Sequence, residues 1–351
     1  MSRKSATHGS DRAARVLPLP VLATLGLLAA GLVAAGPWYL DEGTMRIGSE
    51  ILLVLAMAQM WNLLAGYAGL LSFGHQAFVG VGAYSAFVVS NGLGLNPYVS
   101  LLAAPLGAGI AAALLAPMLF RLRDAYFAIG IWVVAEVFSI LSGKIPGFGG
   151  QLGMTLMSIR QLDFTTFSIA IFWISGAVAL GSLVVVSAVL RSDIGLALSA
   201  VRNNERAALS LGIDVWKIRF VTFVISAAGV GLAGAVYFVS SLQVVPAAAF
   251  DLNWAVMMLF ITIIGGIGRV EGPIIGAVVY FALRELFSDY GNWYLVLTGL
   301  VAVVTMLLAP QGIWGLLHRK LNFEIFGVRR PVPGEAARMG KTRGKTAAET
   351  P

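Results

Sequence analysis

The sequence predicts an all-α polytopic membrane protein, and three observations lead to this fold class. Hydrophobic residues make up 58% of the 351 residues and charged residues only 12%, whereas about a quarter of the residues of a soluble domain are charged. The mean hydropathy is +0.85. Apolar runs of about 20 residues, the length with which a helix crosses a bilayer, recur along most of the chain.

We expect about ten spans, although eight or nine remain open because glycine-rich segments can form broken helices. The predicted spans cover residues of about 17–40, 47–66, 70–91, 97–120, 125–143, 164–190, 216–240, 250–268, 272–288 and 292–309. The first run follows basic residues, as the apolar region of a signal peptide does. It is too long for that role and lacks a clear small-x-small cleavage site before Trp38 and Tyr39, so we interpret it as a retained span.

The distribution of charge predicts the orientation of the chain. Both tails are basic, and they hold much of the net charge of +7. Because basic segments beside spans stay cytoplasmic, we expect residues 1–16 and 318–351 in the cytoplasm, around one transmembrane domain of residues 17–317. We expect the polar second tail to be disordered. The basic excess therefore predicts anchoring in the lipid bilayer of the inner (cell) membrane and no nucleic-acid binding.

A polar interruption at residues 191–215 is the main exception to the apolar pattern. Ser192 or Asp193 can cap the start of a helix, and Gly212 suits its C-terminal end. A charged helix of about residues 200–212 cannot lie in hydrocarbon, so we expect it on the cytoplasmic surface, docked into another protein. The residues that we expect to make or shape this contact are Arg202, Glu205, Ala207, Ala208, Leu209 and Gly212.

A few polar residues and glycines inside the predicted spans are candidates for lining a translocation path. They are Asn62, Gly74, His75, Glu136 and Gly266. An unpaired carboxylate is costly in a bilayer, so we expect Glu136 to face the interior of the helix bundle. There it would either pair with a neighbouring polar side chain or neutralise the ammonium group of a substrate. His75 is either a hydrogen-bonded packing residue, which we favour, or a substrate ligand.

Residue types that catalysis or cofactor binding would need are scarce. The chain has no cysteine, and its three histidines lack the spacing of a metal site, so we expect no metal and no catalytic residue. Residues 229–234 match the dinucleotide-binding pattern, but they lie within an apolar run of span length. The glycines that precede Lys341 are one residue too far apart for a phosphate loop. We therefore expect no cofactor in this chain, and ATP only on partner subunits.

Several groups of residues occur in an order that is specific as a set. They are Trp61–Gly69, Leu71–Phe78, Gly80–Tyr84, Asp124–Ile129, Gly265–Gly276 and Ala309–Leu317. This set, spread over residues of about 45–320, resembles the LivM-type permeases of branched-chain amino-acid ATP-binding-cassette (ABC) importers. The polar interruption resembles the coupling loop of ABC permeases, except that Arg206 separates Glu205 from the two alanines.

The resemblance implies a subunit that carries leucine, isoleucine and valine across the membrane. It also implies three kinds of partner: a second homologous permease, two cytoplasmic ABC ATPases, and a periplasmic or extracellular substrate-binding protein. Import of urea or short amides is the alternative within the family. From another class, an ion-coupled secondary transporter would use Glu136 as its ion carrier, but it would not need a docking loop. A membrane-embedded enzyme would lack an acid–base or metal constellation.

Overall fold

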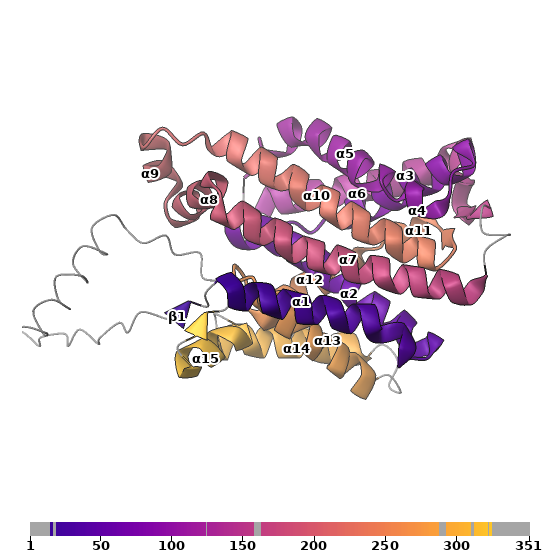
Figure 1. The fold of residues 1–351 in the computed structure, drawn as a ribbon. Helices are drawn as coiled ribbons and strands as arrows, with labels where there is room; N and C mark the ends of the chain where they lie inside the picture. The colour runs from indigo at the N-terminus through magenta and orange to yellow at the C-terminus, as the bar shows by residue number, and fades with distance from the viewer. Residues whose placement is uncertain are drawn as a thin grey trace, which may run out of the picture.

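The computed structural model describes residues 15–16, 19–123, 125–157, 163–287, 293–309, 312–321 and 323–324. This part of the chain is a bundle of helices that run roughly along one direction (Figure 1). The long helices are α1 (Leu19–Ala35), α2 (Glu42–Asn62), α3 (Gln76–Leu93), α5 (Ala103–Leu119), α6 (Ala125–Lys144), α7 (Phe164–Arg191), α10 (Val215–Ser240), α12 (Leu252–Gly265), α13 (Gly272–Leu286) and α14 (Trp293–Leu308). Each of them overlaps one of the ten predicted runs.

Seven segments in the described residues are long and apolar enough to cross a membrane. They are Glu42–Tyr67, Pro97–Leu119, Ala125–Lys144, Thr165–Arg191, Val215–Ser240, Pro246–Gly265 and Gly299–Leu316. The predicted class, an all-α multi-pass membrane protein, is therefore confirmed. The number of ten spans stays a prediction, because α1, α3 and α13 are not among the seven.

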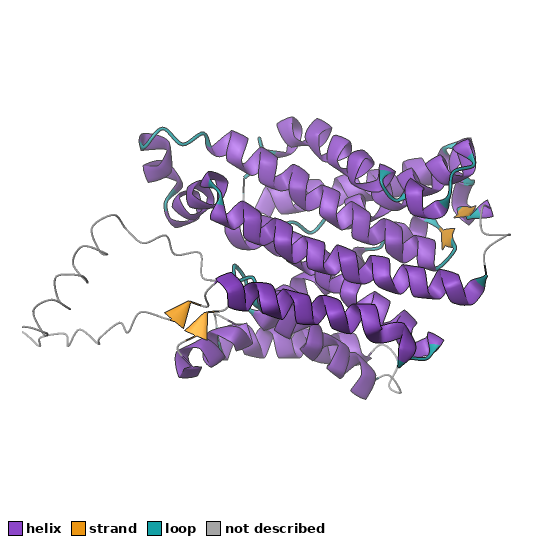
Figure 2. Ribbon diagram, in the orientation of Figure 1, coloured by secondary structure: helices purple, strands orange, loops and turns teal. Residues whose placement is uncertain are grey.

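Short elements connect the long helices (Figure 2). They are η1 (Gly36–Trp38), the π-helix η2 (Leu63–Tyr67), α4 (Pro97–Ser100), η3 (Pro146–Phe148), η4 (Gly150–Leu152), α8 (Asp193–Asn203), α9 (Glu205–Ser210), α11 (Pro246–Ala249) and α15 (Gly312–Leu321). Strand β2 (Met154–Thr155) pairs antiparallel with β3 (Gln243–Val244).

Both ends of the described chain lie at the same end of the bundle. Strand β1 (Arg15–Val16) pairs in parallel with β4 (Phe323–Glu324), which brings the two termini side by side. Helices α8 and α9 lie at this same end (Figure 1). Nearly all residues of the two tails, 1–16 and 318–351, lie outside the described residues. The disorder predicted for the second tail therefore stays a prediction.

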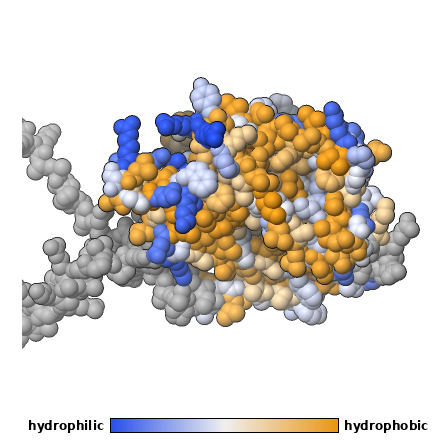
Figure 3. All heavy atoms as spheres, turned by 90° about the horizontal axis from the view of Figure 1, so that it is seen from above, coloured by the Kyte–Doolittle hydropathy of each residue, from blue (hydrophilic) through white to orange (hydrophobic). Residues whose placement is uncertain are grey.

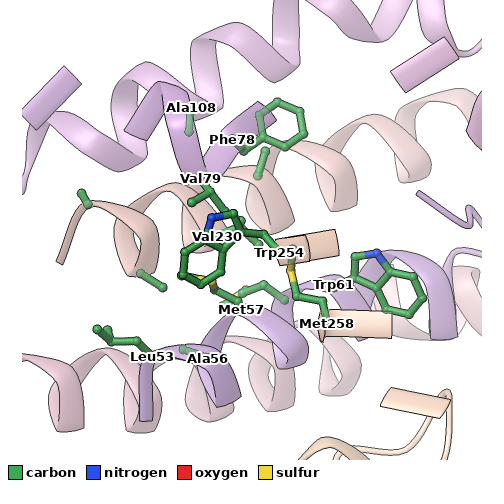
Figure 4. Packing of buried hydrophobic residues seen from close by; sticks show 14 of the residues in the cluster. Leu53, Ala56, Met57, Trp61, Phe78, Val79, Ala108, Val230, Trp254 and Met258 are labelled. Carbon is green, nitrogen blue, oxygen red and sulfur yellow. The ribbon is translucent and has the colours of Figure 1, made fainter. Parts of the chain in front are cut away.

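Helices α2, α3, α10 and α12 form the centre of the bundle, and small residues let them approach closely. A Cβ atom on Gly82 of α3 would lie 2.2 Å from the carbonyl oxygen of Gly231 in α10, so only glycine fits there. Residues 229–234 are thus a packing surface of α10. Large side chains fill the neighbouring space (Figure 4), among them Leu53, Met57, Trp61, Phe78, Val230, Trp254 and Met258.

The outer surface of the bundle is apolar over its middle. Figure 3 shows hydrophobic side chains across one face, with hydrophilic residues gathered toward its ends. Fully apolar exposed positions such as Leu28 (65%) and Leu32 (76%) of α1 belong to this surface. Exposed aliphatic residues in this number are expected where lipid replaces water as the solvent.

Candidate functional site

The polar interruption forms two short helices, α8 and α9, and we call them, together with the two residues that end α9, the projection (residues 193–212). The prediction of one helix over 200–212 is wrong because Asn204 breaks it. Asn204 has extended backbone angles (φ −160°, ψ 101°). Its side-chain Oδ1 accepts a hydrogen bond from the backbone N–H of Ala207 at 3.1 Å and so caps α9. The side chain of asparagine thus competes with continuation of α8.

Gly212 ends α9 as predicted. Its φ of +81° lies in the left-handed region, which a glycine adopts without strain. The N–H of Gly212 donates to the carbonyl of Leu209 at 3.0 Å, and that of Ile213 donates to the carbonyl of Ala208 at 3.1 Å. These two bonds form a Schellman motif. Asp214 then caps α10 by accepting from the N–H of Lys217 at 3.0 Å.

Both helices of the projection are held on the bundle, α8 by Leu198, which is buried in the main hydrophobic core. Val201, Ala208 and Val215 form a buried apolar cluster. Glu205 forms an ion pair with Arg219 of α10, with Oε2 and Nη2 2.9 Å apart. Ala208 therefore stabilises the projection from inside, and the expectation that a partner contacts it directly is not supported by its exposed fraction of 1%.

Other predicted contact residues do point outward. Ala207 is exposed. The side chain of Leu209 is 55% exposed and that of Leu211 is 78% exposed. Two exposed leucines beside the exposed Arg206 give an apolar patch with a charged border, at the predicted cytoplasmic end. This is the composition with which a helix enters a groove of another protein.

Two breaks in the helices meet next to the projection, and we call their meeting point the junction (residues 63–75 and 266–271). Buried amide side chains of α2 tie the breaks together. Gln59 Nε2 donates to the carbonyl of Val270 at 2.6 Å, and Asn62 Nδ2 donates to that of Arg269 at 2.8 Å. The N–H of Gly268 donates to Asn62 Oδ1 at 2.8 Å. Asn62 thus satisfies backbone groups that a broken helix leaves unpaired.

Glycines allow the two breaks to touch. A Cβ atom on Gly66 would lie 2.5 Å from the backbone nitrogen of Gly268. Gly266 has a φ of +131°, and a Cβ atom on Gly312 of α15 would lie 2.3 Å from its Cα atom. Gly74 lies against α6, where a Cβ atom would be 2.1 Å from the carbonyl oxygen of Ile131. The predicted path residues Gly74 and Gly266 therefore lie in the junction, and Asn62, the last residue of α2, is hydrogen-bonded to it.

Arg202 connects the projection to the junction. A Cβ atom on Gly268 would lie 2.2 Å from Arg202 Nη1, so the guanidinium group rests on the glycine backbone. Gly268 itself has a φ of +73°. Arg202, Arg269 and Glu271 are also close enough to Tyr67 to act on it electrostatically. A displacement of α8 would consequently reach the junction through one side chain.

His75 is a buried packing residue with both ring nitrogens hydrogen-bonded. Nδ1 lies 2.7 Å from Ser72 Oγ, and Nε2 lies 3.0 Å from Ser226 Oγ. The hydroxyl of Ser226 donates to the carbonyl of Met60 at 2.6 Å, so it must accept from Nε2–H. Nδ1 then accepts from Ser72, which gives a neutral imidazole. This network agrees with the favoured structural interpretation of His75.

Glu136 does not face the bundle interior, and that prediction is wrong. It is exposed on the outer face of α6, beside the exposed Trp132 and Val133. The opposite side of α6 is fixed by Phe127 and Ile131, which are buried. A carboxylate at mid-membrane costs about 2.5–3.5 kcal/mol on insertion scales, so this face of α6 requires a covering other than lipid.

Sequence reasoning missed an ion pair within the bundle. Arg284 Nη1 of α13 lies 2.5 Å from Glu50 Oε1 of α2, with side chains 39% and 23% exposed. The Arg284 guanidinium also lies 5.6 Å from the centre of the Phe281 ring. The sequence contained a signal for this pair, because both residues interrupt predicted spans and ionisable residues in spans are rare.

Sequence reasoning also missed Gln76. In the described residues neither of its buried amide atoms has a hydrogen-bond partner.

Comparison with known proteins shows which family the chain belongs to. The family described as branched-chain amino acid transport system / permease component matches residues 45–310. The chain belongs to this permease family. As a multi-pass membrane permease, it belongs with transport proteins and not with enzymes. Among the described residues, no group of His, Cys, Asp and Glu is placed to hold a metal ion.

Individual relatives of this permease agree with the family match. The chain is 27% identical to the high-affinity branched-chain amino acid transport system permease protein LivM of Escherichia coli, over 84% of this chain and 75% of the relative. The LivM protein of Salmonella typhimurium is similar to the same extent. The probable permease protein LivH of Methanocaldococcus jannaschii is 26% identical, over 80% of this chain and 93% of the relative. No solved structure matches the chain significantly.

Proposed function

We propose that this chain is the membrane-spanning permease subunit of an ABC importer for leucine, isoleucine and valine. Its partners are a second homologous permease, two cytoplasmic ABC ATPases and a substrate-binding protein outside the inner membrane. The names of its LivM and LivH relatives support the substrate class and the type of system. The chain itself contributes no cofactor, and ATP binds to the ATPase subunits.

The observation that carries this proposal is the projection itself. A bundle that is apolar at its surface exposes Leu209 of α9 and Leu211, the residue that ends α9, at one end. The same projection reaches the junction through Arg202. A transporter driven by a separate ATPase needs both features, namely a docking surface and a contact that passes movement to the spans. An ion-coupled carrier needs neither.

The topology that we propose has ten spans with both termini in the cytoplasm. Support comes from the pairing of β1 with β4 and from the position of α8 and α9 at the same end (Figure 1). Asp41 and Asp163 start α2 and α7 at the opposite end, where hydrogen bonds from Thr44 and Thr166, respectively, hold their pKa values below the usual range. Charged caps of this kind suit a water-exposed surface.

Reconstitution tests the proposed function. The chain is purified together with a second permease of the same family, two ABC ATPases and a substrate-binding protein from the same organism, and placed in proteoliposomes. We expect uptake of radiolabelled leucine that requires ATP and the binding protein and is inhibited by valine but not by urea. Inhibition by urea alone would assign the alternative substrate class. Uptake driven by a proton or sodium gradient without ATP would contradict the proposal.

A further inference from the structure

The outward position of Glu136 is the feature that the proposed function leaves unexplained. Helix α6 runs from Ala125 to Lys144, so Glu136 lies about 17 Å from its start and about 12 Å from its end. The carboxylate is therefore near the middle of the helix. In the described part of the chain it has no hydrogen-bond or ion-pair partner, and it is exposed.

The packing of α6 fixes this direction. Gly74 rests on the α6 backbone at Ile131, where a Cβ atom would lie 2.1 Å from the carbonyl oxygen. Ile131 and Ala135 are fully buried against the bundle. Rotating α6 so that Glu136 faces inward would break the backbone contact with Gly74 and would expose the side chains of Ile131 and Ala135. The carboxylate therefore stays on the outer face.

The carboxylate of Glu136 distinguishes this face from a lipid-facing one. The exposed residues one turn away on α6 are apolar: Trp132 (40%), Val133 (52%) and Ile140 (54%). Helix α1 offers a comparison, because its exposed residues, among them Leu28 (65%), include no charge. One carboxylate surrounded by exposed apolar side chains is expected where another protein covers the apolar residues and leaves a small polar space at the carboxylate.

We infer that the α6 face formed by Ile129, Trp132, Val133, Glu136, Val137 and Ile140 is covered by the second permease subunit. Glu136 faces a water-filled path between the two subunits and attracts the ammonium group of the amino acid that passes. This inference rests on the proposed function, which supplies both the partner and a cationic substrate group. The similarity of the chain to both LivM and LivH permeases supports a partner of the same family. Water in the path removes the cost of the unpaired charge, and the negative charge suits an ammonium ion.

Cysteine labelling tests the position of the face, because the chain has no cysteine of its own. The variants Val133→Cys and Ile140→Cys are compared with Leu28→Cys of α1, which is equally exposed in the single chain. The complete transporter is placed in membrane vesicles and treated with a cationic, membrane-impermeant methanethiosulfonate. We expect the two α6 variants to react at least about tenfold faster than Leu28→Cys, since only a path between subunits holds water. Excess leucine should slow their reaction.

Photocrosslinking identifies what covers the face. With benzoylphenylalanine at Val133, we expect an adduct with the second permease, and with the same group at Leu28 we expect none. Adducts with lipid alone at Val133, together with labelling no faster than that of Leu28→Cys, would overturn the inference. Such a result with normal ATP-driven leucine uptake would leave the proposed function intact. Absence of uptake by the unmodified transporter would instead contradict the proposed function.

Uptake measurements test the role of the charge. Glu136→Gln removes the negative charge at constant size, and we expect about tenfold slower leucine uptake, the effect of one charge-assisted interaction. Glu136→Asp keeps the charge and should restore most of the rate. Equal uptake by the wild type and the Gln variant would show that Glu136 does not attract the ammonium group, even if the cysteine variants of α6 reacted as expected.

Discussion

The projection and the junction lie against each other, yet they are held in different ways. Leu198, which is fully buried in the main core, anchors helix α8, whereas α9 is held only by the cluster around Ala208 and the partly exposed pair of Glu205 and Arg219. Buried amides of Gln59 and Asn62 and closely packed glycines fix the junction. An exposed ion pair is worth about 0–1 kcal/mol, whereas a buried polar group left unpaired costs about 1–3 kcal/mol. Helix α9 is therefore the part of the projection that can shift most easily, and the junction is the part that moves as one unit.

Substitution of Gly66 tests the junction with the largest expected effect. Gly66→Val places a side chain where a Cβ atom already lies 2.5 Å from the nitrogen of Gly268. Overpacking costs about 1–3 kcal/mol or more, and separating the breaks also removes hydrogen bonds of Asn62. We expect little folded protein, measured as monodisperse yield and melting temperature. Gly31→Val in α1, where no atom lies within 4 Å, is the control and should remain close to wild type.

Substitution of Asn62 separates hydrogen bonding from packing in the junction. Asn62→Leu keeps the volume but leaves the N–H of Gly268 and the carbonyl of Arg269 unpaired. We expect a loss of about 1–3 kcal/mol of stability, seen as a lower melting temperature in detergent. If Asn62→Leu melts like the wild type, the amide does not hold the two breaks together.

Substitution of Leu211 tests the docking surface of the projection. Leu211 is 78% exposed, so Leu211→Asp should not affect folding, but it places a charge in the apolar contact with the ATPase. We expect a loss of about 1–2 kcal/mol of binding, measured by co-purification and titration of the ATPase. Leu152→Asp at the opposite end of the bundle, where Leu152 is 85% exposed, is the matched control. Equal ATPase binding by both variants would show that the projection is only a connector.

Titration of Asp163 gives the smallest expected effect, at the end of the bundle opposite the projection. The backbone N–H and then the hydroxyl of Thr166 donate to its carboxylate and lower its pKa. Because the folded pKa is below the unfolded value of about 4, the charged cap stabilises at pH values above 4 and loses this effect as the pH falls through the folded pKa. The melting temperature of Asp163→Asn should thus be slightly below that of the wild type at pH 7, and the two should be equal at the lowest pH tested. A difference in melting temperature that does not change with pH would contradict a stabilising role of the charge on Asp163.

Much of the fold follows from local patterns in the sequence, as particular elements show. The apolar runs predicted where the helices lie, because a helix that crosses lipid needs about 20 apolar residues. Gly212 predicted the end of α9 because a left-handed residue is needed there. Asn204 was overlooked as a break, since one asparagine in a charged, alanine-containing segment does not prevent a helix by itself.

The site depended on contacts that no local pattern contains. Asn62 bonds to residues more than 200 positions away. Ala208 points inward only because Val201 and Val215 meet it from the neighbouring helices. Helix α6 is apolar on most sides, with Glu136, two serines and a terminal lysine as its polar residues, so no amphipathic period indicated which side faces the bundle.

The ratio of leucine uptake to ATP hydrolysis in proteoliposomes tests most directly whether the projection drives the junction. Arg202→Gln removes the guanidinium group that rests on Gly268, and Arg206→Gln changes an exposed arginine of the same projection. We predict that both variants retain their ATPases, that Arg206→Gln keeps the wild-type ratio, and that Arg202→Gln hydrolyses ATP with much less uptake. A wild-type ratio in Arg202→Gln would contradict coupling through this contact.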